Sequence, residues 1–261
     1  MPMNLQRLLV LATMLLSCYG AHCEGPGDLF QLGVNAYRAG DFSGAAGIFR
    51  AAAENQPSSG TLQNLGSSEW QTGRTGPAVL AWEQALWVDP FNKTARMNLR
   101  YARRVEQVES PQLAWFEVIS TWLPANWWAP ITGMSLWLAI GITFIPGVLR
   151  QRKAVWQQGL SAFLLMIFLL TLPALLGVRT RGKIGFVVEK KVPLRLTPTA
   201  EAQQITQMRS GDPARFERVR NDYVMVQTSR GRGWLKAGEL GLTCPRQEAE
   251  RSQAGGTADR H

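Results

Sequence analysis

Side chains that could carry out acid–base or metal chemistry are scarce in this chain. Its 261 residues include only two histidines, His22 and His261, although histidine is the commonest general base and zinc ligand. The three cysteines, Cys18, Cys23 and Cys244, support no metal site or framework of disulfide bonds. Cys23 and Cys244 could pair in an oxidising compartment, but they lie at the outer edges of different regions. Because no nucleophile–base pair or metal cluster can be assembled, we expect a non-enzymatic protein without a metal or cofactor.

One cysteine is a candidate for lipidation. Arg7 is followed by the apolar run 8–16 and then by small and polar residues, which is the layout of a secretory signal. We assign that signal to residues 1–23. The sequence Leu-Leu-Ser-Cys18 resembles a bacterial lipoprotein processing site, which would make Cys18 the lipidated residue. Ordinary cleavage a few residues later and a retained signal anchor are the alternatives.

Two apolar stretches, 127–149 and 159–178, divide the rest of the chain. Neither contains a charged side chain. About twenty residues at a helical rise of 1.5 Å give about 30 Å, the thickness of a bilayer's hydrocarbon core. Inside lipid every backbone polar group needs an internal partner, so such stretches form helices. We therefore predict a transmembrane hairpin with a short loop at 150–158. A hairpin buried in a large soluble core is the alternative, although core helices usually carry a polar stripe.

Tryptophans and charges indicate how this hairpin is oriented. Six of the ten tryptophans lie between residues 115 and 156, and most flank the apolar stretches, where such rings favour the membrane–water boundary. We predict an interfacial segment at 111–126. The basic cluster at 150–153 favours a cytoplasmic loop, the cluster at 179–183 opposes it, and the signal decides between them. Both soluble regions would then face the periplasm from a bacterial inner membrane.

The net charge of +9 is concentrated in the C-terminal half. Up to Leu149 there are nine Lys and Arg against ten Asp and Glu, and from Arg150 onward nineteen against nine. A basic balance permits nucleic acid, anionic lipid or acidic cell-wall polymer as a partner. We exclude nucleic acid, because a region outside the cytoplasm would not meet it.

The region before the hairpin contains a repeat. Residues 29–57 and 62–90 match with an offset of 33, close to the 34 of a helix–turn–helix repeat. The matched positions are Leu32/Leu65, Gly33/Gly66, Tyr37/Trp70, Gly40/Gly73, Ala45/Ala78, Phe49/Trp82, Ala52/Ala85 and Pro57/Pro90. Small residues would let paired helices approach, aromatic residues would fill the space between pairs, and glycines would make the turns. Residues 93–104 begin like a further first helix, so we expect two repeats and a cap over 26–106.

This pattern resembles the tetratricopeptide (TPR) repeat, and the resemblance implies a groove lined by the first helices that holds a peptide or a partner helix. The residues expected to face it are Val34, Tyr37, Arg38, Ser67, Trp70, Gln71 and Asn98. The alternative is that Tyr37 and Trp70 are packing residues.

Beyond the hairpin the helical period disappears. Short β-rich runs at 186–188, 192–196, 214–219, 223–227 and 233–235 predict a small all-β barrel of five strands within 183–244. The segments Leu-Arg-Leu-Thr-Pro198, Ser-Gly-Asp212 and Gly-Trp-Leu235, with a closing Leu240, resemble the bacterial SH3-like (SH3b) domain. Such domains bind peptides or cell-wall polymer. The polar tail at 245–261 is expected to be disordered.

The candidate binding residues of this region are basic or aromatic. Six arginines would give it a basic face, which a solvated surface beside an anionic membrane also explains: Arg195, Arg215, Arg218, Arg220, Arg230 and Arg232. Trp234 is either a core residue of the barrel or part of a ligand groove.

The order of signal, TPR pair, two spans and SH3-like domain resembles the E component of the bacterial Bat (aerotolerance) group. This resemblance implies a multidomain, membrane-held scaffold. Its implied partners are Bat proteins with von Willebrand A domains and a MoxR-type AAA+ ATPase, in a complex linked to stress or oxygen tolerance. A protein that binds or senses peptidoglycan through its SH3-like domain is the alternative.

Overall fold

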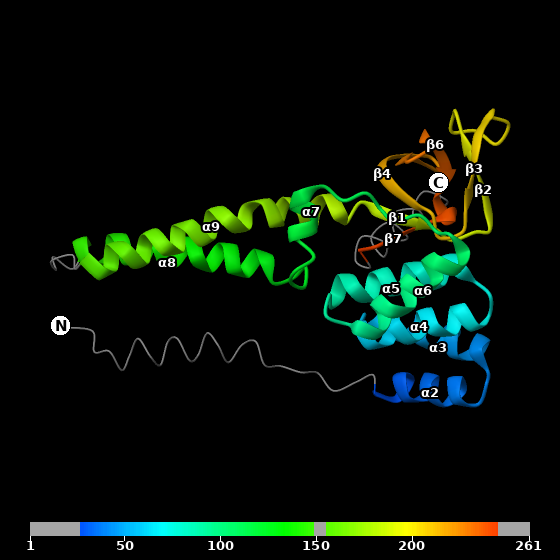
Figure 1. Ribbon diagram of the computed structural model, residues 1–261, viewed down its shortest axis with the longest axis horizontal. Coiled ribbons are helices and arrows are strands. Elements are labelled where there is room, and N and C mark those ends of the chain that lie inside the picture. Colours follow the sequence, from blue (N-terminus) through cyan, green and yellow to red (C-terminus); the bar gives the residue numbers. More distant parts are fainter. Residues whose placement is uncertain (1–26, 149–154, 245–261) are drawn as a thin grey trace, which may run out of the picture.

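A computed structural model gives the fold of the protein and describes residues 27–148 and 155–244. The signal, Cys18, the basic cluster at 150–153 and the tail at 245–261 lie outside the described residues. The described residues form a stack of helices, an apolar helical hairpin and an antiparallel sheet (Figure 1). Helix and sheet are therefore mixed in one chain, as expected.

The helix stack consists of five consecutive helices with short turns between them. They are α2 (Gly27–Arg38), α3 (Phe42–Asn55), α4 (Ser59–Gln71), α5 (Thr75–Val88) and α6 (Lys93–Glu106). The side chains of Asp41, Ser58 and Asn92 each accept a hydrogen bond from a backbone N–H three residues on, which caps α3, α4 and α6. Gly40 and Gly73 have φ of 83° and 74° in equivalent turns, a conformation that glycine adopts without steric cost.

The repeat predicted from the sequence has a direct structural counterpart. A Cβ on Gly33 would lie 2.7 Å from a ring atom of Phe49, and one on Gly66 would lie 2.5 Å from the ring of Trp82. Both rings are fully buried. Each helix pair thus has an aromatic ring against the backbone of a glycine, because any side chain there would hold the helices apart. The offset of 33 correctly predicted the equivalence of these two contacts.

Helices α8 (Trp128–Val148) and α9 (Val155–Arg181) form the hairpin, and the short helix α7 (Trp115–Ile119) packs against α9. Hydrogen bonds between hydroxyl groups join α8 to α9: Thr132 Oγ1 with Thr171 Oγ1 at 2.9 Å, and Thr143 Oγ1 with Ser161 Oγ at 2.6 Å. Ser161 Oγ also donates to the carbonyl of Ala139 in α8 at 3.2 Å. Such polar pairs hold helices together where lipid provides no other partner.

The boundaries of the second span were predicted too short. Helix α9 includes residues 155–158, which we assigned to the loop, and it continues past 178 to Arg181. A charged side chain ends an apolar run without ending a helix, since arginine is a good helix former. The first apolar stretch, predicted as 127–149, agrees with α8 to within one residue at each end.

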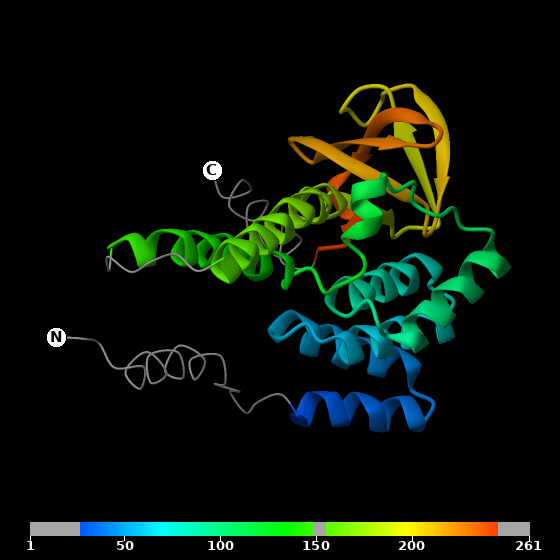
Figure 2. The ribbon, with the colours of Figure 1, turned by 60° about the vertical axis from the view of Figure 1, so that its left-hand side comes forward.

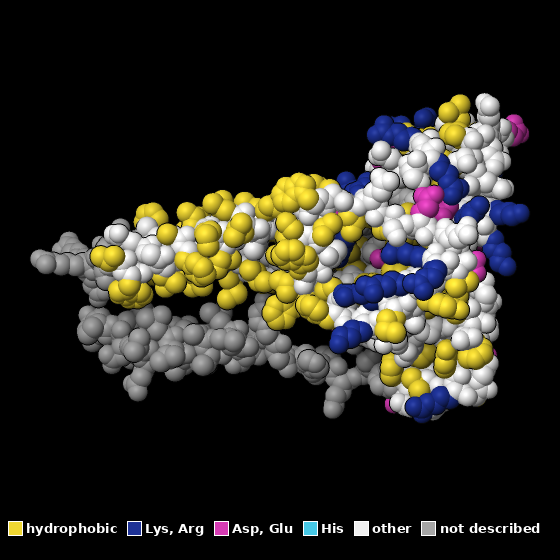
Figure 3. All heavy atoms as spheres, in the orientation of Figure 1, with side chains coloured by type: hydrophobic (Ala, Val, Ile, Leu, Met, Phe, Trp, Pro, Cys, Tyr) yellow, Lys and Arg dark blue, Asp and Glu magenta, His cyan; other side chains and the backbone are white. Residues whose placement is uncertain are grey.

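The hairpin is exposed along most of its length. In the described part of the chain, α8 and α9 are long and apolar enough to cross a membrane, and only 22% and 17% of their most apolar windows are buried. Apolar side chains cover the outside of the hairpin (Figure 3). A hairpin in the core of a soluble protein would be mostly buried, so this exposure argues against that alternative.

The sheet domain is a seven-stranded antiparallel sheet with the order β3-β2-β6-β5-β4-β1-β7. Its strands are β1 (Ile184–Val187), β2 (Lys191–Arg195), β3 (Gln204–Arg209), β4 (Pro213–Arg220), β5 (Tyr223–Thr228), β6 (Gly231–Lys236) and β7 (Leu240–Leu242). We had expected five strands. The additional ones are β3, an edge strand in which only Met208 is buried, and β7, which has only three residues. Neither presents the apolar alternation that reveals a strand in sequence.

The helix stack and the sheet domain meet in a shared hydrophobic cluster, and each also has a cluster of its own. Ile184 and Phe186 of β1 pack among Leu62, Val79 and Trp82 of the stack. At the same interface the backbone N–H of Gly76 donates to Ser210 Oγ at 2.8 Å, and Gln84 Nε2 donates to the carbonyl of Leu242 at 2.9 Å. Figures 1 and 2 show the two parts in contact at the same end of the hairpin.

Candidate functional site

The predicted groove residues lie on the first helix of each pair. Helices α2, α4 and α6 are neighbours in the stack, and we call their common surface the first-helix face. The three helices carry all seven predicted residues: Val34, Tyr37 and Arg38 on α2, Ser67, Trp70 and Gln71 on α4, and Asn98 on α6. Of these, Arg38 and Gln71 are exposed and the others are partly buried.

Two of the three helices of this face are linked by side chains. Asn98 Nδ2 donates to Ser67 Oγ at 3.3 Å, and the ring of Tyr101 lies edge-on to Trp70 with ring centres 5.9 Å apart. Tyr101 is 58% exposed and was not among the predicted residues. The signal that could have found Tyr101 is its position one helical turn after Asn98, which puts the two side chains on the same side of α6.

Tyr37 and Trp70 also have packing roles. Tyr37 packs edge-on against Phe42 at 5.1 Å and contacts the cluster around Phe49. Trp70 lies 5.9 Å from the ring of Trp82. Both rings remain partly accessible. Each therefore supports the stack with one side and leaves the other side available to a partner.

Three of the six predicted sheet-domain arginines form salt bridges. Arg215 pairs with Glu117 of α7, and Arg232 Nη2 lies 3.0 Å from Glu217. Arg230 lies 3.2 Å from Glu109, in the segment between α6 and α7. Arg230 and Arg215 thus attach the sheet domain to the chain segment that leads into the hairpin, and part of their charge is neutralised there.

The remaining sheet residues are arranged differently. Arg218 and Arg220 are exposed at the end of β4, and the guanidinium of Arg218 lies 5.5 Å from the ring centre of Trp234. Arg195 donates to the carbonyl of Ala200. Trp234 is 5% exposed, so it belongs to the packed interior rather than to an open groove.

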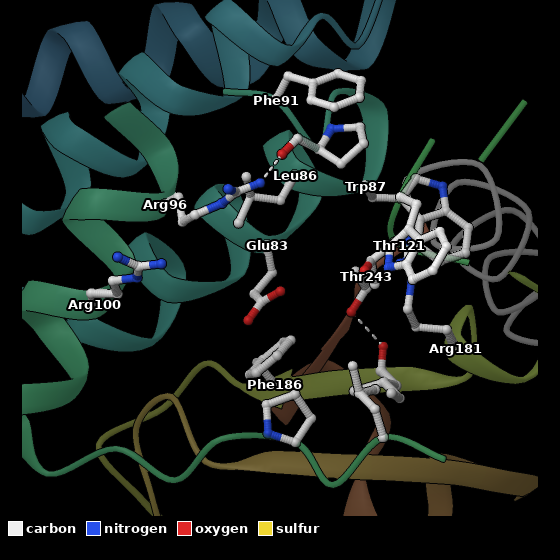
Figure 4. Close-up of a pocket in the computed structure, with 15 residues that line it drawn as sticks. Glu83, Leu86, Trp87, Phe91, Arg96, Arg100, Thr121, Arg181, Phe186 and Thr243 are labelled. Atoms are coloured by element: carbon white, nitrogen blue, oxygen red, sulfur yellow. Dashed lines mark hydrogen bonds between the residues drawn. The ribbon is translucent and has the colours of Figure 1, made fainter. Parts of the chain in front are cut away.

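A cleft of about 590 Å³ opens where the helix stack, the end of α9 and the sheet domain meet (Figure 4). We call it the junction cleft. Its apolar wall comprises mainly Leu86, Trp87, Phe91, Leu113, Trp122 and Phe186. Its charged residues are Glu83, Arg96, Arg100 and Arg181. Glu83 projects from α5 toward Phe186, with Arg96 and Arg100 of α6 on one side and Arg181 on the other.

The charged side chains of the junction cleft differ in the partners they have. Glu83 forms a salt bridge with Arg103. Burial raises the pKa of the Glu83 carboxyl above its ordinary value of 4.5, and the opposing effect of Arg103 and Arg181 is smaller. Arg96 donates to the carbonyl of Pro90, and the guanidinium of Arg181 lies 4.6 Å from the ring centre of Trp87.

The side chains of the cleft suit the binding of a ligand. Arginines against aromatic and aliphatic walls can hold an anion or an amphiphile. The described residues contain no group of three or more His, Cys, Asp or Glu side chains that could hold a metal ion. Sequence reasoning missed this cleft because its residues come from helices, strands and linkers on both sides of the hairpin.

Comparisons with known proteins add no identification: no protein-family model, no curated protein and no solved structure matches this chain.

Proposed function

We propose that this protein is a non-enzymatic scaffold of the bacterial inner membrane. One observation carries the proposal: the helix stack and the sheet domain are packed together at one end of an exposed apolar hairpin. A hairpin that crosses the bilayer and returns leaves both parts in the same compartment. Following the charges and the signal sequence, that compartment is the periplasm.

The first-helix face is the recognition surface in this proposal. The Gly–aromatic contacts that repeat at an offset of 33, and the neighbouring first helices, support the resemblance to TPR repeats. Exposed Arg38, Gln71 and Tyr101 provide charged, polar and aromatic groups, a mixture common at protein interfaces. By the resemblance to the Bat E component, the partners are Bat proteins with von Willebrand A domains, working with a MoxR-type ATPase.

The sheet domain acts mainly as a support in this scheme. The salt bridges of Arg215 and Arg230 with the segment before the hairpin favour this role over peptidoglycan binding by a free basic face. In this proposal the sheet domain is an SH3-like domain. Because the helix stack is packed against this support, the recognition surface would be held at a fixed distance from the membrane.

Topology is tested first. Protease added to intact spheroplasts is expected to degrade both the helix stack and the sheet domain. Protection of either part would contradict the shared compartment.

Recognition is tested by co-expressing the full-length protein with the von Willebrand A domain Bat proteins and measuring their co-purification. The double variant Arg38→Glu/Gln71→Glu replaces one positive and one neutral side chain of the first-helix face with two negative ones. It removes no core side chain. We expect it to reduce partner recovery about tenfold, equivalent to about 1.4 kcal/mol. The control Glu54→Lys changes an exposed charge on α3, a second helix, and should leave recovery unchanged. Equal recovery from both variants would contradict binding by this face.

A further inference from the structure

The junction cleft lies at the base of the hairpin. Arg181, the last residue of α9, forms part of its wall, and so does Trp122, which is 64% exposed. Exposed tryptophans near the ends of membrane spans mark the membrane–water boundary. The cleft therefore lies at the level where lipid headgroups would be found.

Arg181 is a buried cation of the cleft whose guanidinium is only partly hydrogen-bonded. Its side chain is 7% exposed, and its Nε has no hydrogen-bond partner within residues 27–148 and 155–244. Within the same ranges it forms no salt bridge, because Glu83 pairs with Arg103; the charges of Glu83 and Glu117 attract Arg181 only from a longer distance. Contact with the Trp87 ring compensates only part of the cost of removing a guanidinium from water. A ligand with an anionic acceptor would supply what this arginine lacks.

The rest of the cleft also favours an anion. Arg96 and Arg100 of α6 line the side of the cleft opposite Arg181, and Glu83 between them is its single carboxylate. Figure 3 shows Lys and Arg side chains over the helix stack next to the base of the hairpin. Guanidinium groups bind phosphate through paired N–H donors, which makes arginine the preferred residue for such ligands.

We propose that the junction cleft binds the phosphate headgroup of an anionic phospholipid, with Arg181 as its main contact. The apolar wall receives the first part of an acyl chain. This inference rests on the membrane anchoring in the proposed function, because the lipid enters from the bilayer. Bound lipid would join the hairpin, the helix stack and the sheet domain at the one place where all three meet.

The apolar residues that line the junction cleft favour a lipid over a soluble anion. Leu86, Trp87, Phe91 and Phe186 offer a free phosphate no hydrogen-bonding side chain other than the Trp87 indole, but they match hydrocarbon. The volume of about 590 Å³ exceeds what an inorganic ion fills and lies within the roughly 300–1,000 Å³ of ligand sites.

The test measures binding to the full-length protein in a nonionic detergent, by native mass spectrometry. The probes are phosphatidylglycerol, phosphatidylcholine and inorganic phosphate. We expect phosphatidylglycerol to bind at least tenfold more tightly than phosphatidylcholine, and Arg181→Gln to abolish that preference. The control Arg179→Gln removes an exposed charge from the same helical turn and should retain it. If Arg181→Gln does not fold, as judged by thermal unfolding, Arg100→Gln takes its place and should weaken the preference severalfold.

Three outcomes would overturn the proposal. They are equal binding of the two lipids by the wild-type protein, an unchanged preference in the cleft variant, and displacement of phosphatidylglycerol by millimolar inorganic phosphate. The last result would assign the cleft to a free anion. Because this measurement requires no bilayer, it can fail while the spheroplast experiment succeeds, so the two proposals are tested separately.

Discussion

Arg215 and Glu117 form a two-pronged salt bridge between residues 98 positions apart in the chain. Nη1 of Arg215 lies 2.7 Å from Oε1 of Glu117, and Nη2 lies 3.0 Å from Oε2. Glu117 is 1% exposed in α7, and Arg215 belongs to β4. The pair joins the helix that packs against α9 to the sheet domain, and so connects the hairpin mechanically to the soluble parts.

Removing the arginine is expected to loosen this connection. Arg215→Ala leaves a buried carboxylate without its main partner, and a lost hydrogen bond to a charged group costs about 2 kcal/mol. The thermal unfolding midpoint of the detergent-solubilised protein should fall accordingly. Arg220→Ala, on the exposed end of the same strand, serves as the control and should change the midpoint little. Equal effects of the two substitutions would show that the salt bridge contributes nothing specific.

The same carboxylate makes stability depend on acid. Burial raises the pKa of Glu117, but hydrogen bonds from Arg215 and from the Ala114 N–H outweigh it, so the pKa in the folded protein lies below the ordinary 4.5. Such a group contributes stability above its unfolded pKa and loses that contribution as pH falls through its folded pKa. The hydroxyl of Ser229 likewise lowers the pKa of Glu109. The stability that these two carboxylates contribute should therefore decrease as the pH drops below about 4.5, the ordinary carboxyl pKa, whereas the raised pKa of Glu83 acts in the opposite direction.

This acid dependence can be assigned by substitution. Glu117→Gln keeps the shape of the side chain but cannot titrate, so its stability between pH 7 and pH 3 should decrease less than that of the wild-type protein. Chemical unfolding at several pH values measures the difference. A parallel decrease in both proteins would assign the acid sensitivity to other carboxylates.

Close contact between α9 and α7 depends on a glycine. A Cβ at Gly177 would lie 2.3 Å from the carbonyl oxygen of Phe116, so Gly177→Ala forces the helices apart. Overpacking of this kind costs about 1–3 kcal/mol. At Gly159 of the same helix no atom lies within 4 Å of the added Cβ, and Gly159→Ala is the matched control. Faster proteolysis in the segment around α7, seen for Gly177→Ala alone, would confirm the role of this contact.

A second glycine controls docking of the helix stack on the sheet domain. A Cβ at Gly76 would lie 2.4 Å from the carbonyl oxygen of Val187, whereas one at Gly47 meets nothing within 4 Å. Gly76→Ala should lower the unfolding midpoint and increase hydrogen exchange along β1. Gly47→Ala, in an exposed helical position, should instead stabilise the protein by about 0.5–1 kcal/mol, since alanine favours the helix. A stabilising Gly76→Ala would show that the two parts do not need this close approach.

Local sequence patterns were sufficient to predict those features that depend on residues near one another in the chain. The equivalence of Gly33 with Gly66 and of Phe49 with Trp82 follows from a repeat offset that is visible in the sequence, whereas the contact of each ring with its glycine was seen only in the structure. The extent of α8 follows from an apolar run, because backbone groups in such a stretch satisfy one another within a single helix. Strand β3 was missed because, as an edge strand, it needs few apolar side chains.

The sequence by itself determined the order of parts: repeated helix pairs, an apolar hairpin and a β-rich region. Hydrophobic periodicity and composition indicate helices and strands from neighbouring residues alone, so no contact with a distant segment is needed to recognise them. Only the tertiary structure decided which charges are used between the parts. It paired Arg215 with Glu117, set Arg181 beside Trp87 in a cleft, and packed strand β1 against the helix stack. The cost of burying a charge depends on what long-range packing brings next to it, and spacing along a chain does not encode that neighbour.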